Sequence, residues 1–203
     1  MKVTDIKQQV KRKDRYSIFV DGKYSFALSE SGLISSGLKV GLDLSAQDLE
    51  DLKKHAVEDK GVYRALDLIA RRPRSAGEIT DYLKRKGYEE EEAEKILNRL
   101  SEKGYIDDES FARSWVENRR LLKPTSRRKL RLELKQKKVA EDIIQEVLKE
   151  GNVDEAETLR KLIVKKLQQA RYRDRQKLMQ YLARQGFNYS DIKEALDDIA
   201  GDA

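Results

Sequence analysis

From residue 63 onward, apolar residues recur with the spacing of amphipathic helices, and the same pattern returns at intervals of about 50 residues. Segment 73–88 reads PRSAGEITDYLKRKGY, segment 124–139 reads PTSRRKLRLELKQKKV, and segment 178–187 reads LMQYLARQGF. The equivalent apolar positions are Ile79, Leu130 and Leu178; Leu83, Leu134 and Leu182; Ala93, Ile144 and Ile192; and Leu97, Leu148 and Leu196. Self-similarity on this scale is typical of stacked helical units, which offer a long surface and favour binding over catalysis.

Each copy of this pattern predicts three helices, and in the first copy we expect them at about 63–72, 76–86 and 89–103. Ser75 and Glu78 have the spacing of a capping box at the start of the second helix. A shared stop signal, in which a left-handed glycine is followed by an aromatic residue, is expected at Gly87, Gly104 and Gly186. The third copy should follow Gly151-Asn152 and open with a long helix over about 155–171.

The first 28 residues predict β structure instead. Asp21-Gly22 lies between two apolar runs and predicts a hairpin that pairs Val20 with Lys23 and Phe19 with Tyr24. That pairing places Phe19, Tyr24, Phe26 and Leu28 on one face of the sheet, and Tyr16, Ile18, Val20 and Ala27 on the other. Because an isolated hairpin is marginally stable, we expect a third strand from about residue 2 to 10. Short helices should follow at 29–35 and from Ser45, which has capping-box spacing to Asp48.

We therefore predict a mainly α protein, with three tandem three-helix repeats in an extended array after a small N-terminal β-hairpin or three-stranded leader. The expected domains are residues 1–60 for the leader with its short helices, 61–108 for the first repeat, 109–152 for a basic second repeat, and 153–203 for the third repeat. The chain has no cysteine, no signal peptide at its N-terminus and no apolar run of membrane-spanning length. We expect a soluble, cytoplasmic monomer that does not bind membranes.

The net charge of +6 is concentrated in the second repeat. Residues 109–152 carry 12 basic and 7 acidic side chains, whereas each of the three other predicted domains is within one charge of neutrality. Between Arg119 and Lys138 there are ten basic residues and a single acid, Glu133. Such a segment favours an anionic partner, although a charge run of this kind is also typical of a merely solvated helix face.

The second helix of this repeat arranges its charges along one flank. Leu130 and Leu134 define its inward stripe, and at 100° per residue the cations on its flank are Arg127, Arg131, Lys135 and Lys138, with Arg128 at the edge. We predict that these five residues carry binding and that Arg119, Arg120 and Lys123 support them. These eight cations are called the basic face below. Like charges at this spacing destabilise a helix by a few tenths of a kcal/mol per pair, which an external anion relieves.

Leu132 lies roughly opposite the inward stripe of the same helix. Our hypothesis is that Leu132 is an exposed apolar contact within the basic face. The alternative is that a neighbouring repeat buries Leu132, as stacked units require. A second basic group on the long helix of the third repeat, from Arg160 to Arg175, is balanced by acids near the C-terminus, and such a bipolar surface suits docking along another protein.

Signals of catalysis are nearly absent from the sequence. There is no phosphate-binding glycine loop and no cysteine nucleophile, and His55 is the only histidine. Asp107, Asp108 and Glu109 have the position of helix-capping residues, although the same trio could also be imagined as a metal site. The first repeat superficially resembles a winged helix-turn-helix, but its third helix opens with the run 89–92 of four glutamates, which phosphates would repel. We expect a non-enzyme without cofactors or metals.

Several stretches together resemble the RecX family, bacterial regulators of the RecA recombinase. They are Ser75–Gly87, the run from Lys103 to Arg113, and the repeated three-helix plan, over roughly residues 60–200. The β-rich leader resembles the N-terminal extension of longer members. The resemblance implies a regulator of recombination and DNA repair in the SOS response that lies in the groove of the RecA–single-stranded DNA filament. Family members block filament growth or promote its disassembly, and suppress ATP hydrolysis and strand exchange.

The residues alone do not name RecA as the partner. The basic face could meet an acidic surface of the filament, the backbone of single- or double-stranded DNA, or both. The alternative function is a stand-alone nucleic-acid-binding protein without sequence preference. Few aromatic residues are expected to be exposed for base stacking, which disfavours that alternative.

Overall fold

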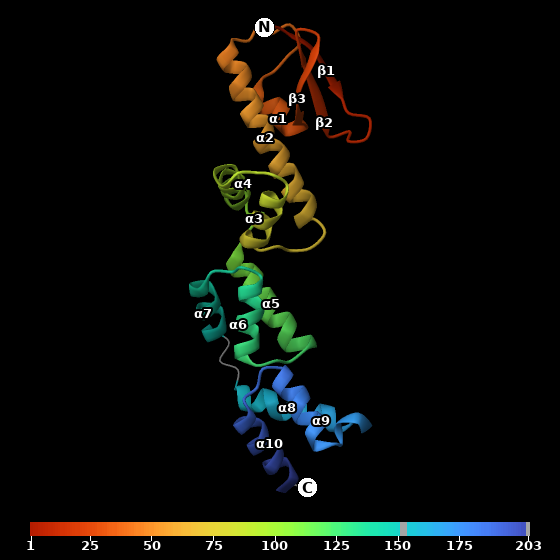
Figure 1. The fold of residues 1–203 in the computed structure, drawn as a ribbon, viewed down its shortest axis with the longest axis vertical. Coiled ribbons are helices and arrows are strands. Elements are labelled where there is room, and N and C mark those ends of the chain that lie inside the picture. The colour runs from red at the N-terminus through yellow and green to blue at the C-terminus, as the bar shows by residue number, and fades with distance from the viewer. Residues whose placement is uncertain (151–153, 202–203) are drawn as a thin grey trace. The chain divides into compact units, whose positions relative to one another are not determined.

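The computed structural model describes residues 1–150 and 154–201 of the chain (Figure 1). The described residues form one three-stranded sheet and ten α-helices, which confirms the predicted mainly α class. The chain divides into two compact units, Met1–Ile106 and Asp107–Ala203. The predicted passage at Gly151-Asn152 lies outside the described residues.

An antiparallel sheet of order β1-β2-β3 opens the first unit. Its strands are β1 (Val3–Gln8), β2 (Arg15–Val20) and β3 (Lys23–Ser29). The turn between β2 and β3 pairs Val20 with Lys23, as predicted, and both turn residues have positive φ, +49° at Asp21 and +77° at Gly22. β1 is the expected third strand.

A β-bulge next to this turn makes our assignment of the sheet faces wrong. Phe19 pairs with Tyr24 as predicted, but the next pair is Ile18 with Phe26, so Ser25 is an extra residue on β3. The rings of Phe19 and Tyr24 meet edge to face, with centroids 6.0 Å apart. Beyond Ser25 every side chain of β3 therefore points to the face opposite the predicted one, because side chains alternate along a strand.

The bulge gathers the apolar side chains of both strands on one buried face. Phe26 and Leu28 join Ile18 and Val20 there, and all four are buried. Ala27 moves to the other face. The result is a core for the leader, which Val3 and residues of the following helices complete.

Two helices pack against the sheet, α1 (Glu30–Ser36) and α2 (Ala46–Ile69). Ser45 caps α2 through the predicted capping box with Asp48. The expected short helix from Ser45 and the separate helix at 63–72 are wrong, since α2 is one continuous helix of 24 residues. Its first half packs on β3 and its second half on the helices of the first repeat, so one helix completes two cores.

The helices α3 (Ala76–Arg85) and α4 (Glu90–Glu102) complete the first repeat with α2. Ser75 accepts a hydrogen bond from the backbone N–H of Glu78, as its capping role requires. Gly61 lets α2 approach α4 closely, because a Cβ at this position would lie 2.2 Å from Cδ1 of Ile96. Residues 108–122 are helical, so no wing follows α4.

The second unit contains the other two repeats. The second repeat consists of α5 (Asp108–Leu122), α6 (Arg127–Gln136) and α7 (Glu141–Glu150). The third repeat consists of α8 (Glu155–Leu167), the short 3-10 helix η1 (Ala170–Tyr172), α9 (Arg175–Arg184) and α10 (Tyr189–Gly201). Helix α8 therefore ends earlier than the long helix expected over 155–171.

The second helix of each repeat ends with the same type of backbone hydrogen bond. The backbone N–H of Tyr88, Val139 and Phe187 donates to the carbonyl five residues earlier, on Leu83, Leu134 and Leu182 respectively. The preceding residue is left-handed in all three, with φ +84° at Gly87, +59° at Lys138 and +93° at Gly186. The equivalent apolar positions predicted from the repeats all lie in or against the separate hydrophobic cores of the three repeats.

The start of α6 also supports the third repeat. Thr125 donates its hydroxyl to the carbonyl of Gln185 (2.7 Å), and the backbone N–H of Ser126 donates to the same carbonyl (3.0 Å). Lys129 donates its ammonium group to the carbonyl of Arg184 (2.7 Å). The C-terminal carbonyls of α9, which have no partner within the helix, are thus bound by residues of the second repeat. Among the described residues, no helix is long and apolar enough to cross a membrane.

Candidate binding surface

The predicted basic face extends from the last turn of α5 through the α5–α6 connection and along α6. It ends at Lys138, just after the C-terminus of α6. Six of its eight cations are exposed, and Arg119 and Arg120 are partly buried. The structure does not bring all eight together, since several are held by carboxylates from neighbouring elements. Three groups can be distinguished.

The first group is built around Trp115 on α5. Its ring stacks on Phe111, with centroids 6.1 Å apart, and its Nε1 donates to Oε2 of Glu133 (3.0 Å). Arg119 donates its Nε to the same oxygen (2.7 Å), and its guanidinium lies 4.9 Å from the Trp115 ring centroid. Lys137 covers the ring at 5.1 Å. Arg119 is therefore packed against the α5–α6 interface, on the flank of α6 opposite Arg131.

The second group lies on the other flank of α6, facing α7. Glu141, at the start of α7, forms ion pairs with both Arg131 and Lys135, the latter at 3.0 Å. Lys135 and Arg131 hold the pKa of Glu141 below its usual value. These two cations keep about half of their side-chain surface exposed (49% and 50%), so they remain accessible to a second anion.

The third group lies where α5 ends and α6 begins. Burial lowers the pKa of Arg120, and the nearby guanidinium of Arg127 lowers it further. Like charges repel each other, and Glu155 of α8 partly offsets the charge of Arg127 by accepting a hydrogen bond from its backbone N–H (3.2 Å).

Arg128 and Lys123 are two cations of the basic face that belong to none of these three groups. Both are exposed, and neither forms an ion pair with a carboxylate within residues 1–150 and 154–201. These two side chains can meet an external anion without first breaking an internal ion pair. Lys138 is exposed too, at a backbone position that is glycine in the other repeats.

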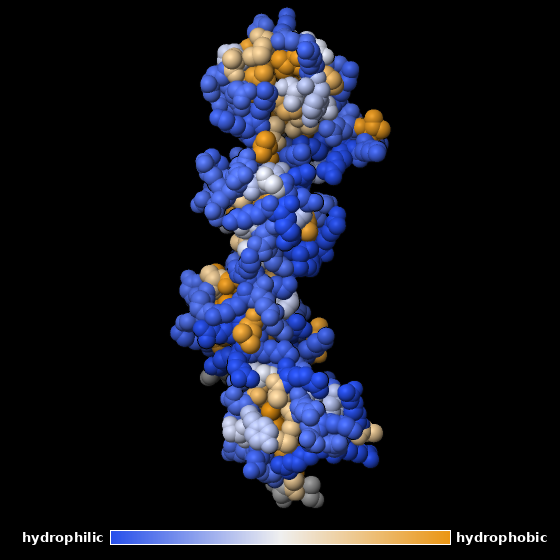
Figure 2. Space-filling model, in the orientation of Figure 1, coloured by the Kyte–Doolittle hydropathy of each residue, from blue (hydrophilic) through white to orange (hydrophobic). Residues whose placement is uncertain are grey.

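Leu132 is 55% exposed on α6, as the hypothesis of an apolar contact requires, and no neighbouring repeat within the second unit buries it. Two further leucines at the end of α5 that we did not single out are more exposed, Leu121 at 79% and Leu122 at 75%. The visible face is mainly hydrophilic with small, separate hydrophobic spots (Figure 2). Their signal in the sequence is a pair of adjacent leucines between two arginines and a lysine, in the segment from Arg119 to Lys123.

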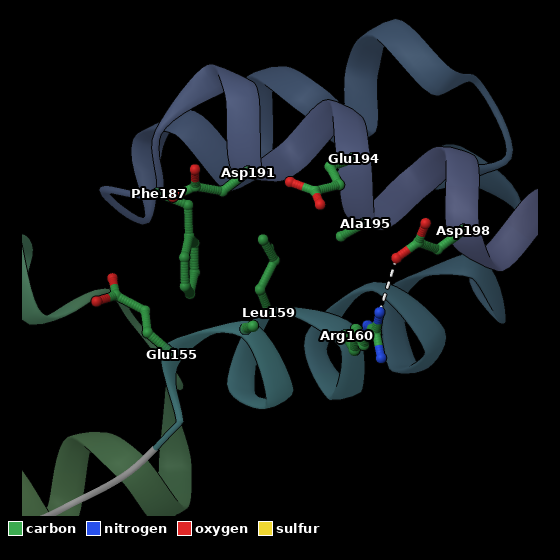
Figure 3. A pocket seen from close by; sticks show the side chains of 9 residues that line it. Glu155, Leu159, Arg160, Phe187, Asp191, Glu194, Ala195 and Asp198 are labelled. Atoms are coloured by element: carbon green, nitrogen blue, oxygen red, sulfur yellow. Dashed lines mark hydrogen bonds and ion pairs between the residues drawn. The ribbon is translucent and has the colours of Figure 1, made fainter.

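The third repeat carries acids on one side. A cavity of about 290 Å³ opens between α8 and α10, with buried Leu159 and Phe187 in its lining and Glu194 at its edge (Figure 3). Arg160 crosses it to donate to Asp198 (2.7 Å). Since carboxylates line this cavity, a polyanion is expected to avoid it.

Asp107 accepts a hydrogen bond from the backbone N–H of Ser110 (2.9 Å), which confirms its capping role and lowers its pKa. Within the described residues, no group of three or more histidine or acidic side chains is arranged to hold a metal ion. The candidate site is a surface of cations and exposed leucines.

Comparison with known proteins identifies the domains along the chain. Family models match it over four segments: the regulatory protein RecX N-terminal domain over residues 1–45, and the first, second and third three-helix domains of RecX over 63–100, 107–148 and 153–196. The chain belongs to the RecX family. The resemblance noted from the sequence is thereby confirmed, and it extends to the β leader.

Individual members of the RecX family align over much of the chain. Regulatory protein RecX of Lactobacillus johnsonii is 37% identical over 153 residues, which cover 75% of this chain and 56% of that protein. RecX of Listeria monocytogenes serovar 1/2a is 30% identical over 208 residues, covering 100% of this chain and 77% of that protein. The chain thus spans little more than half the length of the Lactobacillus relative.

A solved crystal structure of a regulatory protein RecX has the same fold. It superposes with a TM-score of 0.72 at 31% sequence identity, and the match covers 97% of this chain and 98% of that chain. The arrangement of β leader and three-helix repeats is therefore that of the RecX family.

Proposed function

We propose that the protein is a non-enzymatic regulator of recombination and DNA repair that binds the RecA–single-stranded DNA filament through its basic face. Binding would inhibit filament growth, ATP hydrolysis and strand exchange. Membership of a family of regulatory proteins supports the regulatory role. The observation that carries the binding surface is the cluster of accessible cations and exposed Leu132 on α6.

The internal ion pairs refine which residues should carry binding. Arg128 and Lys123 are exposed and form no ion pair with a carboxylate of the described residues, and Arg131 and Lys135 remain half exposed despite Glu141. An anion at these positions gains attraction without uncovering a buried carboxylate. Arg119 would have to leave Glu133 and Trp115 first, so we propose that it acts by supporting α6.

The test is the RecA ATPase on single-stranded DNA with this protein titrated in, alongside its direct DNA binding without RecA. The diagnostic variant reverses three charges, Arg128→Glu, Arg131→Glu and Lys135→Glu. A matched control reverses three exposed cations of the first unit, Arg71→Glu, Lys84→Glu and Lys95→Glu, which have the same formal charge change. Circular dichroism is the control measurement that tests whether both variants keep their helices.

We expect the α6 variant to lose inhibition and the control to retain most of it. Inhibition at protein concentrations that give no DNA binding separates filament regulation from the stand-alone nucleic-acid binding considered above. Equal inhibition by wild type and the α6 variant refutes the assignment of the basic face.

A further inference from the structure

The third repeat has a second group of cations, and the structure sorts them into two kinds. Those on the first half of α8 and at the start of α9 are held by carboxylates: Arg160 by Asp198 at 2.7 Å, Lys161 by Glu157 at 2.8 Å, and Arg175 by Asp197 at 2.5 Å. The cations between them, at the end of α8 and around η1, are not held in this way. They are Lys165, Lys166, Arg171 and Arg173, and none of them forms an ion pair with a carboxylate of the described residues.

The one acid inside this segment is already engaged. Asp174 caps α9 by accepting hydrogen bonds from the backbone N–H groups of Gln176 (2.9 Å) and Lys177 (3.2 Å). These hydrogen bonds lower the pKa of Asp174 and hold its carboxylate at the start of α9. The charge of the four cations is therefore left without local compensation.

Two tyrosines contact two of these cations, Lys166 and Arg171. The rings of Tyr172 and Tyr181 contact each other with centroids 5.1 Å apart and an interplanar angle of 53°, and both are half-buried. The ammonium group of Lys166 lies 4.8 Å from the Tyr181 centroid and 5.2 Å from that of Tyr172, and the guanidinium of Arg171 lies 5.8 Å from Tyr172. One edge of the pair packs on the core of the third repeat.

We infer that this cluster, made of Lys165, Lys166, Arg171, Tyr172, Arg173 and Tyr181, is a binding site for single-stranded nucleic acid. The part-exposed tyrosine rings offer a surface on which an unpaired base can stack, and the surrounding cations reach the adjacent phosphates. Partly buried aromatic rings beside cations fit a base and its phosphate better than they fit an acidic protein surface, which offers carboxylates but no ring to stack.

The surroundings of the cluster fit this ligand. A tyrosine phenol is neutral at neutral pH and does not repel phosphate, and burial together with the neighbouring Tyr172 raises the pKa of Tyr181 further. The acidic cavity is lined by α8 and α10, whereas the cluster is formed by the end of α8, η1 and α9. This site is distinct from the basic face of α6 and does not depend on the function proposed above.

The inference is tested by fluorescence anisotropy of the full chain with a labelled oligothymidylate, without RecA, over a range of salt concentrations. Tyr172→Leu removes a stacking ring, and Arg171→Gln with Arg173→Gln removes two cations that would bind phosphates. We expect Tyr172→Leu to weaken binding roughly five- to tenfold and Tyr172→Phe to keep it. The double arginine variant should reduce the slope of log K against log salt by about 0.7 for each phosphate that is no longer bound.

Matched controls come from the same repeat. Tyr189→Leu changes a tyrosine that is 68% exposed at the start of α10, and Lys161→Gln changes a cation held by Glu157. Both should bind oligothymidylate like wild type, and thermal unfolding shows that every variant is folded. No binding by wild type at low salt, or unchanged affinity for Tyr172→Leu and the double arginine variant, overturns the inference.

Two further arms identify other ligands. A labelled duplex of the same length that binds more tightly than oligothymidylate overturns the single-strand assignment. Poly-glutamate that binds as tightly, with no effect of Tyr172→Leu on either ligand, assigns the cluster to acidic protein surfaces instead. Because RecA is absent from these measurements, their failure leaves the ATPase comparison between wild type and the α6 variant unaffected.

Discussion

The Nε atom of Arg119 lies 2.7 Å from Oε2 of Glu133, so the single acid of the basic segment is bound to one of the arginines that we expected to support partner binding. Both side chains are partly buried, at 29% and 16% exposure. Trp115 donates to the same carboxylate. The relationship makes Arg119 a structural link between α5 and α6.

Arg119→Gln should therefore affect stability more than binding. We expect it to lower the free energy of unfolding by about 1–2 kcal/mol, because the variant loses both a charge-assisted hydrogen bond and a cation–π interaction. Arg128→Gln, on the exposed side of α6, should change stability by less than about 0.5 kcal/mol and raise the concentration for half-maximal RecA inhibition about threefold or more. Chemical denaturation and the ATPase assay measure the two effects, and the opposite ranking would contradict this division.

Glu141→Gln should strengthen binding to the filament. The change frees Arg131 and Lys135 from their shared carboxylate, so both can turn to an external anion. Asp142→Asn is the matched control, because it changes the net charge equally on the same first turn of α7 and Asp142 is exposed. Tighter binding by Glu141→Gln alone supports the competition, whereas equal gains in both variants would show an effect of net charge only.

The same carboxylate predicts a pH dependence. Lys135 and Arg131 lower the pKa of Glu141. An ordinary glutamate takes up a proton at about pH 4.3, and the ion pairs of Glu141 should persist as the pH falls through that value. The pairs are lost only as the pH falls through the lowered pKa. NMR titration of the Glu141 side chain should place its midpoint below that of exposed glutamates, and a midpoint at or above theirs would contradict the ion pairs.

Lys138 occupies a left-handed backbone position, φ +59°, that the other two repeats give to glycine. Lys138→Gly should raise the free energy of unfolding relative to Lys138→Ala by roughly 1 kcal/mol, because glycine adopts positive φ without the clash of a Cβ. Both variants remove the same cation and should weaken filament binding equally. Denaturant unfolding decides the first expectation, and a glycine variant less stable than the alanine variant would show that the backbone is not strained.

Gly61→Ala should destabilise the first unit by about 1–3 kcal/mol, because the new Cβ meets Cδ1 of Ile96 between α2 and α4. Ile96→Val removes that Cδ1 atom. Combined with Gly61→Ala, it should recover part of the loss, so the two changes together cost less than their sum in thermal unfolding. Strict additivity would show that these two groups do not meet.

The sequence predicted the repeats well because their signals are local. Ser75 and Ser45 cap helices at the expected positions, and Gly87 and Gly186 end helices with the expected left-handed backbone. Capping and chain reversal depend on side chains within a few residues, so spacing alone reveals them. The equivalence of Ile79, Leu130 and Leu178 follows equally from helical periodicity.

Other features depended on contacts between distant residues. The extra residue Ser25 reverses the faces of β3, and α2 continues through residue 63 because its two halves pack on different cores. Neither effect has a signal within a short window of the sequence.

The sequence by itself thus determined the family plan, the caps at Ser45 and Ser75, and the concentration of cations in the second repeat. Only the tertiary structure decided which of its cations are accessible. Arg119 is held by Glu133 across the α5–α6 interface, Arg131 by Glu141 of α7, and Arg128 by no carboxylate of the described residues. The reason is physical: the strength of an ion pair depends on distance in space, and the carboxylates that hold these arginines come from other helices.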